Sequence, residues 1–158
     1  MKKMLSILLA VMMIATLALT GCGQNNDPTP DPAPTTRTFT DSLGREVTLP
    51  ANLSKIAISG PLAQIVVFAI APEMMVGIAN GWADEAKGLI PDEYYNLPQL
   101  GQLYGGKGEL NLETLLQSGA EVVIDVGEQK DGMADDLNAL QEQTGIPFVH
   151  IDCYTGSM

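Results

Sequence analysis

The sequence predicts an α/β protein in which a Rossmann-like parallel sheet is flanked by helices. Residues 55–78 contain an apolar run, a stretch with helical apolar spacing and a second apolar run, which together describe a βαβ unit. Residues 111–152 continue the alternation as helix, strand, helix and strand. Connections of this kind close right-handed onto parallel strands, so both stretches are expected to share one sheet.

The chain begins with the composition of a secretory signal peptide. Lys2 and Lys3 precede an apolar run over residues 4–19, which is shorter than the ~20 residues that span a bilayer. The run leads into the sequence LTGC, whose cysteine is Cys22. This pattern resembles the bacterial lipoprotein signal, in which residues 1–21 are removed and Cys22 is lipidated. The alternative is a simple cleaved signal that leaves Cys22 without a role.

Residues 22–36 have the composition of a tether. Prolines occupy positions 28, 30, 32 and 34, and no large apolar side chain is present. Such a segment cannot build a core and favours extended polyproline II, at ~3.1 Å per residue. With a lipid on Cys22, it would hold the domain of residues 37–158 away from a membrane. Without the lipid, it would be a disordered N-terminus.

Composition excludes some classes of function. Without Lys2 and Lys3, six basic residues remain against 19 acidic ones, a net charge of −13, whereas nucleic-acid binders present basic patches. Two cysteines give no disulfide framework. His150 lies in an apolar run without a second ligand at metal-binding spacing, which favours a structural role. We therefore expect no metal and no cofactor.

The first elements of the domain can be placed from turn and helix signals. Residues 37–41 and 46–49 alternate as strands around Gly44, which predicts a hairpin. Residues 55–59 predict a strand. Pro61 suits the first position of the helix that follows it, and residues 75–78 predict a second strand. The apolar residues that share one face of this helix are Leu62, Ile65, Val66, Ala69 and Ile70.

The later elements are bounded by caps. A short helix is expected over residues 84–89, and prolines and glycines then argue against long elements up to residue 108. Asn111 can cap a helix over residues 112–117 that ends at Gly119. Strands are predicted at 121–126 and 146–151. Between them, Asp131 can cap a helix over residues 132–144, which ends at Gly145 and places Met133, Leu137 and Leu140 on one face.

A binding crevice is expected at the carboxyl edge of the sheet, where open α/β folds hold their ligands. Trp82 and Tyr104 offer flat faces with polar edges, although both can simply pack on the sheet. Lys107 can meet an anionic complex or remain solvated. The loops at this edge supply the candidate ligand-binding residues Ser59, Gly60, Pro61, Trp82, Tyr104, Gly105, Lys107, Gly127 and Glu128.

The order of these pieces resembles the N-terminal lobe of a periplasmic-binding-protein family. The family comprises ABC-importer solute-binding proteins for iron–siderophore complexes, haem or cobalamin. The matching sequences are TDSLGREV at 40–47, residues 55–78, NLETL at 111–115 followed by EVVID at 121–125, and residues 144–152. The resemblance covers the chain from about residue 37 to its end.

The resemblance implies a mechanism of capture rather than chemistry. Ligand would lie between two lobes joined by one long helix, and the loaded protein would dock on a membrane permease driven by ATP. Glu113, in the Asn-Leu-Glu motif, would pair with permease arginines; its alternative role is to stabilise the first turn of its helix. The sequence stops near the point where the linking helix would begin. It is therefore interpreted as a fragment lacking the C-terminal lobe, or as a lone lobe.

Two other classes of function stay open at this point. An anchored extracytoplasmic enzyme on a Rossmann-like scaffold would need a nucleophile with a base, or a set of metal ligands. A structural lipoprotein would leave the strand-end loops as unconnected surface. The sequence GQLYGGKG at 101–108 nearly matches a phosphate-binding loop, but Gly108 replaces the required Ser or Thr, and no good strand precedes it.

Overall fold

The computed structural model describes residues 35–105 and 109–153, and all structural statements refer to these ranges. The predicted signal peptide, the lipidation site at Cys22 and most of the tether lie outside the described residues. Lys107 also lies outside them. No helix in the described ranges is both long and apolar enough to cross a membrane.

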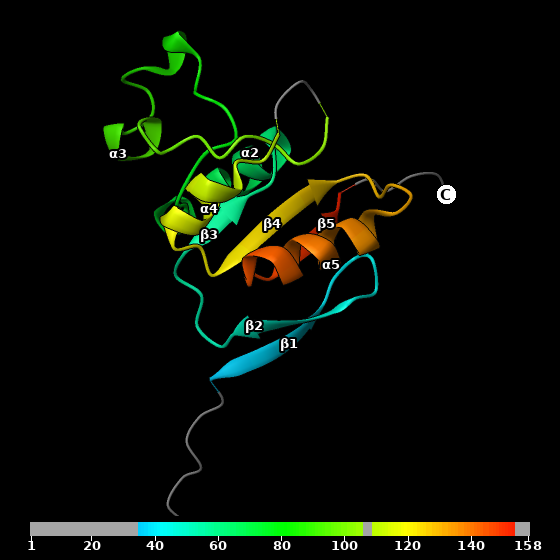
Figure 1. Ribbon diagram of the computed structural model, residues 1–158. Coiled ribbons are helices and arrows are strands. Elements are labelled where there is room, and N and C mark those ends of the chain that lie inside the picture. The colour runs from blue at the N-terminus through cyan, green and yellow to red at the C-terminus, as the bar shows by residue number, and fades with distance from the viewer. Residues whose placement is uncertain (1–34, 106–108, 154–158) are drawn as a thin grey trace, which may run out of the picture. The chain divides into compact units, whose positions relative to one another are not determined.

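The centre of the fold is a parallel sheet of three strands (Figure 1). The strands are β3 (Ile56–Ile58), β4 (Val122–Gly127) and β5 (Phe148–Asp152), in the order β3-β4-β5. Ile56 pairs with Val122, and Val123 pairs with Phe148. The predicted parallel sheet is therefore confirmed. Its strands are near-continuous apolar runs because both faces are covered.

Two further segments extend this parallel arrangement beyond β3 without forming regular strands. Met75 bridges Ile56, and Gln99 bridges Ile78, both in the parallel sense. The strand predicted at 75–78 is thus present only as single bridges. One reason is that Pro98 accepts a bond from the Ile78 amide through its carbonyl but has no N–H of its own to donate.

The two faces of the sheet have different covers. One face packs against α2 (Pro61–Ile70) and against the antiparallel hairpin of β1 (Thr36–Thr40) and β2 (Glu46–Pro50). The other packs against α4 (Leu112–Ser118) and α5 (Met133–Thr144). Alternate residues of each strand serve alternate faces: Val122 belongs to the first core and Val123 to the second.

Helix α2 forms as predicted, but most of the apolar face predicted for it is exposed. Leu62, Ile65 and Ile70 are 44%, 61% and 76% exposed, whereas Ala63 and Gln64 are buried. The Gln64 side-chain oxygen accepts hydrogen bonds from the backbone N–H groups of residues 79 and 80, at 2.7 and 3.3 Å. This interaction turns a polar residue inward; Val67 and Phe68 pack on the core, whereas Leu62, Ile65 and Ile70 face solvent.

The caps of the later helices agree with the sequence at three of four ends. Asn111 Oδ1 accepts a bond from the Thr114 N–H at 3.0 Å, and Gly119 and Gly145 end their helices in the left-handed conformation. The cap predicted at Asp131 is wrong. Gly132 is the N-cap of α5, with φ 78° and no side-chain cap bond, because the chain enters this helix through a left-handed turn.

Between residue 78 and α4, the described part of the chain contains only short helical elements. These are η2 (Asp84–Ala86) and α3 (Asp92–Tyr95), and a further 3₁₀ turn, η1 (Pro72–Met74), precedes residues 75–78. The helix expected over residues 84–89 is therefore a single 3₁₀ turn. α3 and η2 form the excursion at the upper left of Figure 1.

The turn of the hairpin is tied to β5 by a buried ion pair. Arg45 Nη2 lies 2.7 Å from Asp41 Oδ2 and also donates to the Phe148 carbonyl, while Nη1 donates to Asn138 Oδ1 at 2.9 Å. Burial alone would raise the pKa of Asp41, but hydrogen bonds from Arg45 and backbone amides outweigh it and hold that pKa below its ordinary value. The DSLGR sequence thus anchors the hairpin.

Candidate functional site

Loops from three parallel segments meet at the carboxyl edge of the sheet. Ser59 directly follows β3, and its N–H donates to the Ile124 carbonyl at 3.1 Å. The Leu103 N–H donates to the Ser59 carbonyl at 2.7 Å, which brings the loop containing Tyr104 to the same edge. Gly127 ends β4. The predicted convergence of strand-end loops is confirmed for these positions.

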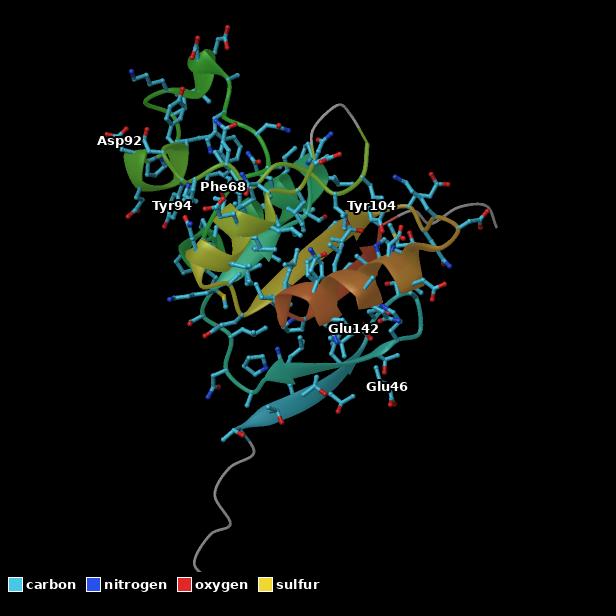
Figure 2. The ribbon with its side chains drawn as sticks, in the orientation of Figure 1. Glu46, Phe68, Asp92, Tyr94, Tyr104 and Glu142 are labelled. Atoms are coloured by element: carbon cyan, nitrogen blue, oxygen red, sulfur yellow. The ribbon has the colours of Figure 1, made fainter. Side chains whose placement is uncertain are left out.

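This edge contains a hollow of about 120 Å³ that is open to solvent. Four predicted residues line it: Pro61, Tyr104, Gly127 and Glu128. In Figure 2, Tyr104 lies at this edge beside the end of β4. The remaining lining residues are Leu62, Asp125, Val126, Lys130 and Met133.

A row of three buried polar side chains runs across the sheet beneath the hollow. Ser59, Asp125 and His150 are 2%, 6% and 0% exposed. The Ser59 hydroxyl donates to Asp125 Oδ1, and His150 Nδ1 lies 2.7 Å from Asp125 Oδ2. Nδ1 therefore carries the proton that it donates to the carboxylate. His150 Nε2 is buried and has no hydrogen-bond partner in the described part of the chain.

The rim of the hollow is formed by Tyr104 and two charged residues. The Tyr104 hydroxyl lies 3.4 Å from Asp136 Oδ2, and the Lys130 ammonium lies 4.8 Å from the centre of the Tyr104 ring. Burial, followed by the negative charges of Asp136 and Asp125, raises the pKa of Tyr104 to about 12. The phenol is therefore neutral at physiological pH, and it donates its one proton to Asp136.

The other predicted site residues within the described ranges do not line the hollow. Ser59 lies below it, and Gly60 is the N-cap of α2. Gly105 accepts a bond from the Gln102 side chain in a left-handed turn. The Trp82 ring lies 5.0 Å from the Phe68 ring, and its N–H donates to the Tyr94 carbonyl. Ligand binding by Trp82 stays a prediction.

No protein-family model matches the sequence, and no curated protein matches it significantly. Solved structures do match. An ABC transporter solute-binding protein from Sulfurospirillum deleyianum superposes with a TM-score of 0.62 at 20% identity, over 74% of this chain and 36% of its own. The molybdate periplasmic binding protein MolA from Haemophilus influenzae, bound to molybdate, gives 0.55 at 25% identity, with coverages of 77% and 36%.

A TroA-like periplasmic binding protein, FepB from Veillonella parvula, gives a TM-score of 0.53 at 22% identity, over 73% of this chain and 36% of its own. The matches cover the N-terminal portion of these proteins. The chain has the fold of the N-terminal lobe of a solute-binding protein. It spans about a third of the length of the structures it matches.

Sequence reasoning missed Asp125 as a site residue of the lobe. Its signal is visible in the sequence EVVIDV, where one carboxylate interrupts an otherwise apolar strand. His150 interrupts the next strand in the same way, and the register pairs the two positions. Charged residues are rarely buried without a partner, so two polar interruptions near the ends of neighbouring strands were a usable sign.

Ser59, Asp125 and His150 are the residue types of a hydrolase triad, but their order in space is different. In a triad, the imidazole lies between the hydroxyl and the carboxylate and removes the hydroxyl proton. In this lobe, the carboxylate lies between the other two groups, so His150 cannot act on Ser59. Within the described ranges, no group of three His, Cys, Asp or Glu side chains could hold a metal ion.

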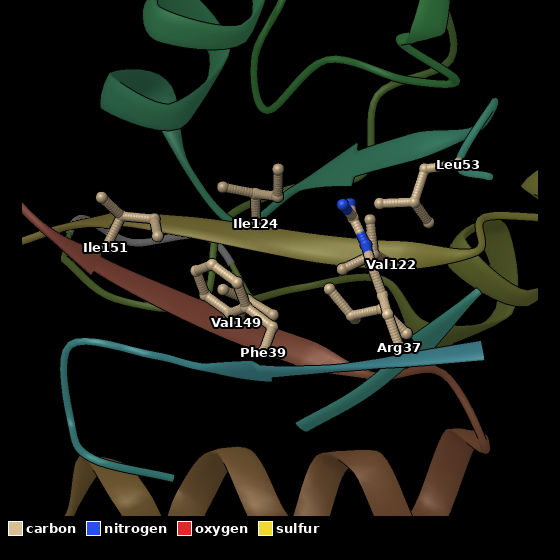
Figure 3. Close-up of a pocket in the computed structure, with 8 residues that line it drawn as sticks. Arg37, Phe39, Leu53, Val122, Ile124, Val149 and Ile151 are labelled. Carbon is tan, nitrogen blue, oxygen red and sulfur yellow. The ribbon is translucent and has the colours of Figure 1, made fainter. Parts of the chain in front are cut away.

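A second hollow lies on the face of the sheet that carries the hairpin (Figure 3). It lies between β1 and the strands β4 and β5, and its lining is apolar except for Arg37. Figure 3 shows Ile124, Val149 and Ile151 of the sheet facing Phe39 of β1. This hollow lacks the convergent polar groups of the carboxyl edge, so the carboxyl edge is the stronger candidate for a ligand site.

Proposed function

We propose that this protein is the solute-binding component of an ABC importer. It would capture an iron complex, either a siderophore or haem, or else cobalamin, outside the cytoplasm and deliver it to a membrane permease. The observation that carries this proposal is the hollow at the carboxyl edge of a lobe whose fold matches solute-binding proteins. Ligands of open parallel sheets bind at this edge.

The size and composition of the hollow suit one wall of a cleft. Its volume of about 120 Å³ is smaller than the roughly 300–1,000 Å³ of complete small-molecule sites, as expected of a single wall of a cleft. Tyr104, Leu62 and Met133 offer apolar surface, and Asp125 and Lys130 offer polar groups. A chelate or macrocycle would lie across this wall and make its remaining contacts with a second lobe.

Glu113 is proposed as the contact to the permease. It lies in the first turn of α4, is exposed, and accepts a hydrogen bond from the Gln117 side chain at 3.2 Å. An exposed carboxylate steers association and fixes register with arginines of a partner. The proposed lipid on Cys22 would hold the protein at the outer face of the membrane, within reach of that permease.

Direct binding tests this proposal. The full chain is titrated with a ferric trihydroxamate, haem and cyanocobalamin, and binding is followed by calorimetry and by quenching of Trp82, the single tryptophan. Saturable binding of one of these ligands at micromolar concentrations supports transport. Absence of binding by all three, together with turnover of a reporter ester, would support an anchored enzyme instead.

A further inference from the structure

The hollow has one acidic group whose position is fixed from two sides. Each carboxylate oxygen of Asp125 has its own buried partner, the hydroxyl of Ser59 and the imidazole of His150. Burying three polar groups in a sheet is unfavourable unless they bond to one another, and bonding holds them in one arrangement. Asp125 alone of the three also lines the hollow.

The charges around the hollow are mainly negative. Among the described lining residues, Asp125 and Glu128 are acidic and only Lys130 is basic. The Lys130 ammonium is placed over the ring of Tyr104, and Asp136 adds a further carboxylate beside the Tyr104 hydroxyl. The other lining residues are apolar or glycine. A bound anion would therefore meet more like charge than opposite charge.

We infer that Asp125, oriented by Ser59 and His150, makes this lobe select ligands that present a hydrogen-bond donor or a positive charge, and disfavour oxyanions. This inference rests on the proposed function and narrows its ligand class. Asp125 is the ligand contact, and His150 is a positioning residue because it acts through Asp125. The preference would differ from that of the Haemophilus protein, which was solved with an oxyanion, molybdate.

A matched pair of ligands tests the preference for charge. One is a ferric trihydroxamate that carries a free amine, and the other is the same complex with the amine succinylated, which replaces a positive charge by a negative one. Molybdate serves as a small oxyanion. We expect the amine form to bind the full chain at least about tenfold more tightly than the succinylated form, and molybdate not to bind measurably.

Variants assign the preference to particular residues. Asp125→Asn keeps the shape of the side chain and removes its charge, so the preference is expected to fall below about threefold. Asp135→Asn, an exposed residue in the first turn of α5, is the matched control and should leave the preference intact. His150→Asn retains a donor near Nδ1 and should preserve part of the preference, whereas His150→Phe should abolish it.

The outcomes separate this inference from the proposed function. Binding of both trihydroxamates with equal affinity, or tighter binding of the succinylated form, overturns the inference and leaves transport standing. Failure of every ligand to bind overturns both. Where Asp125→Asn fails to fold by circular dichroism, the wild-type ligand pair and the His150→Asn variant still decide the question.

Discussion

The guanidinium of Arg45 lies 2.7 Å from the carboxylate of Asp41, and both side chains are almost completely buried. The same guanidinium reaches the Phe148 carbonyl of β5 and the Asn138 side chain of α5. One side chain thus joins the hairpin turn to a strand and a helix that lie about a hundred residues later in the chain.

Replacing Arg45 by methionine should destabilise the domain by about 3 kcal/mol, because it leaves the Asp41 charge buried without its partner. Urea unfolding followed by circular dichroism measures this loss. The exposed Lys87→Met is the matched control and should cost less than about 0.5 kcal/mol. An Arg45 variant as stable as its control would show that the pair does not hold the hairpin.

Acid should weaken the domain through Asp41. The folded-state pKa of Asp41 is lowered, so its contribution to stability is complete above the unfolded pKa of about 3.9 and is lost as pH falls through the folded value. Asp41→Asn should therefore be less stable at neutral pH and should show a flatter decline below pH ~4. Parallel acid-limb slopes for wild type and variant would contradict this assignment.

Gly77→Ala should cost roughly 1–3 kcal/mol because of overpacking. A Cβ at Gly77 would lie 2.5 Å from Leu100 Cγ, and Leu100 is fully buried. Gly60→Ala is the matched control, since its Cβ would come no closer than 3.9 Å to Gln102 Cβ and its φ of 178° is ordinary extended backbone. Thermal unfolding compares the two variants. Adding Leu100→Ala to Gly77→Ala should relieve the overlap and restore part of the stability that Gly77→Ala loses.

The phenol of Tyr104 should lose its proton only at unusually high pH. Its pKa is raised to about 12 by burial and then by the charges of Asp136 and Asp125. Spectrophotometric titration should therefore show a phenolate component that forms near pH 12 and is lost in Tyr104→Phe. In Asp136→Asn the same phenol should titrate at lower pH. Unchanged titration in that variant would show that Asp136 does not act on Tyr104.

Glu113→Gln should separate capture from delivery. The residue is exposed on α4, and ligand affinity should remain within about twofold of wild type, because α4 does not line the hollow. Uptake of labelled ligand in cells that carry the permease should fall at least about tenfold. Glu142→Gln, an acid on α5, is the control, and equal uptake by both variants would argue against docking through Glu113.

Much of the architecture was predictable because local signals and apolar runs agreed. Asn111, Gly119 and Gly145 mark helix ends that the structure shows, and the apolar runs at β4 and β5 became parallel strands. Helix α2 shows where such reasoning fails. Its apolar spacing does not reveal that the Gln64 amide bonds to the backbone of residues 79 and 80, and this contact decides which face is buried.

The position of the candidate site on the sheet was predictable from the sequence, but the roles of its individual residues were not. Topology alone brings Pro61, Tyr104 and Gly127 to one edge. The role of Asp125 depends on the register between β4 and β5, which pairs it with His150 and which no local pattern gives. The burial of Trp82 against Phe68 depends on the path of the irregular segment that follows residue 78.

The pairing of β3 with β4 joins positions 66 residues apart in sequence, as Ser59 and Asp125 also show. A ribosome must therefore release most of the domain before the central strand can find its first neighbour. Until then, the described residues before β4 can form the hairpin, α2 and short local elements, and Leu62, Ile65 and Ile70 of α2 face outward. Such sequence-distant pairing slows folding, because the cost of closing the loop comes before the contacts that repay it.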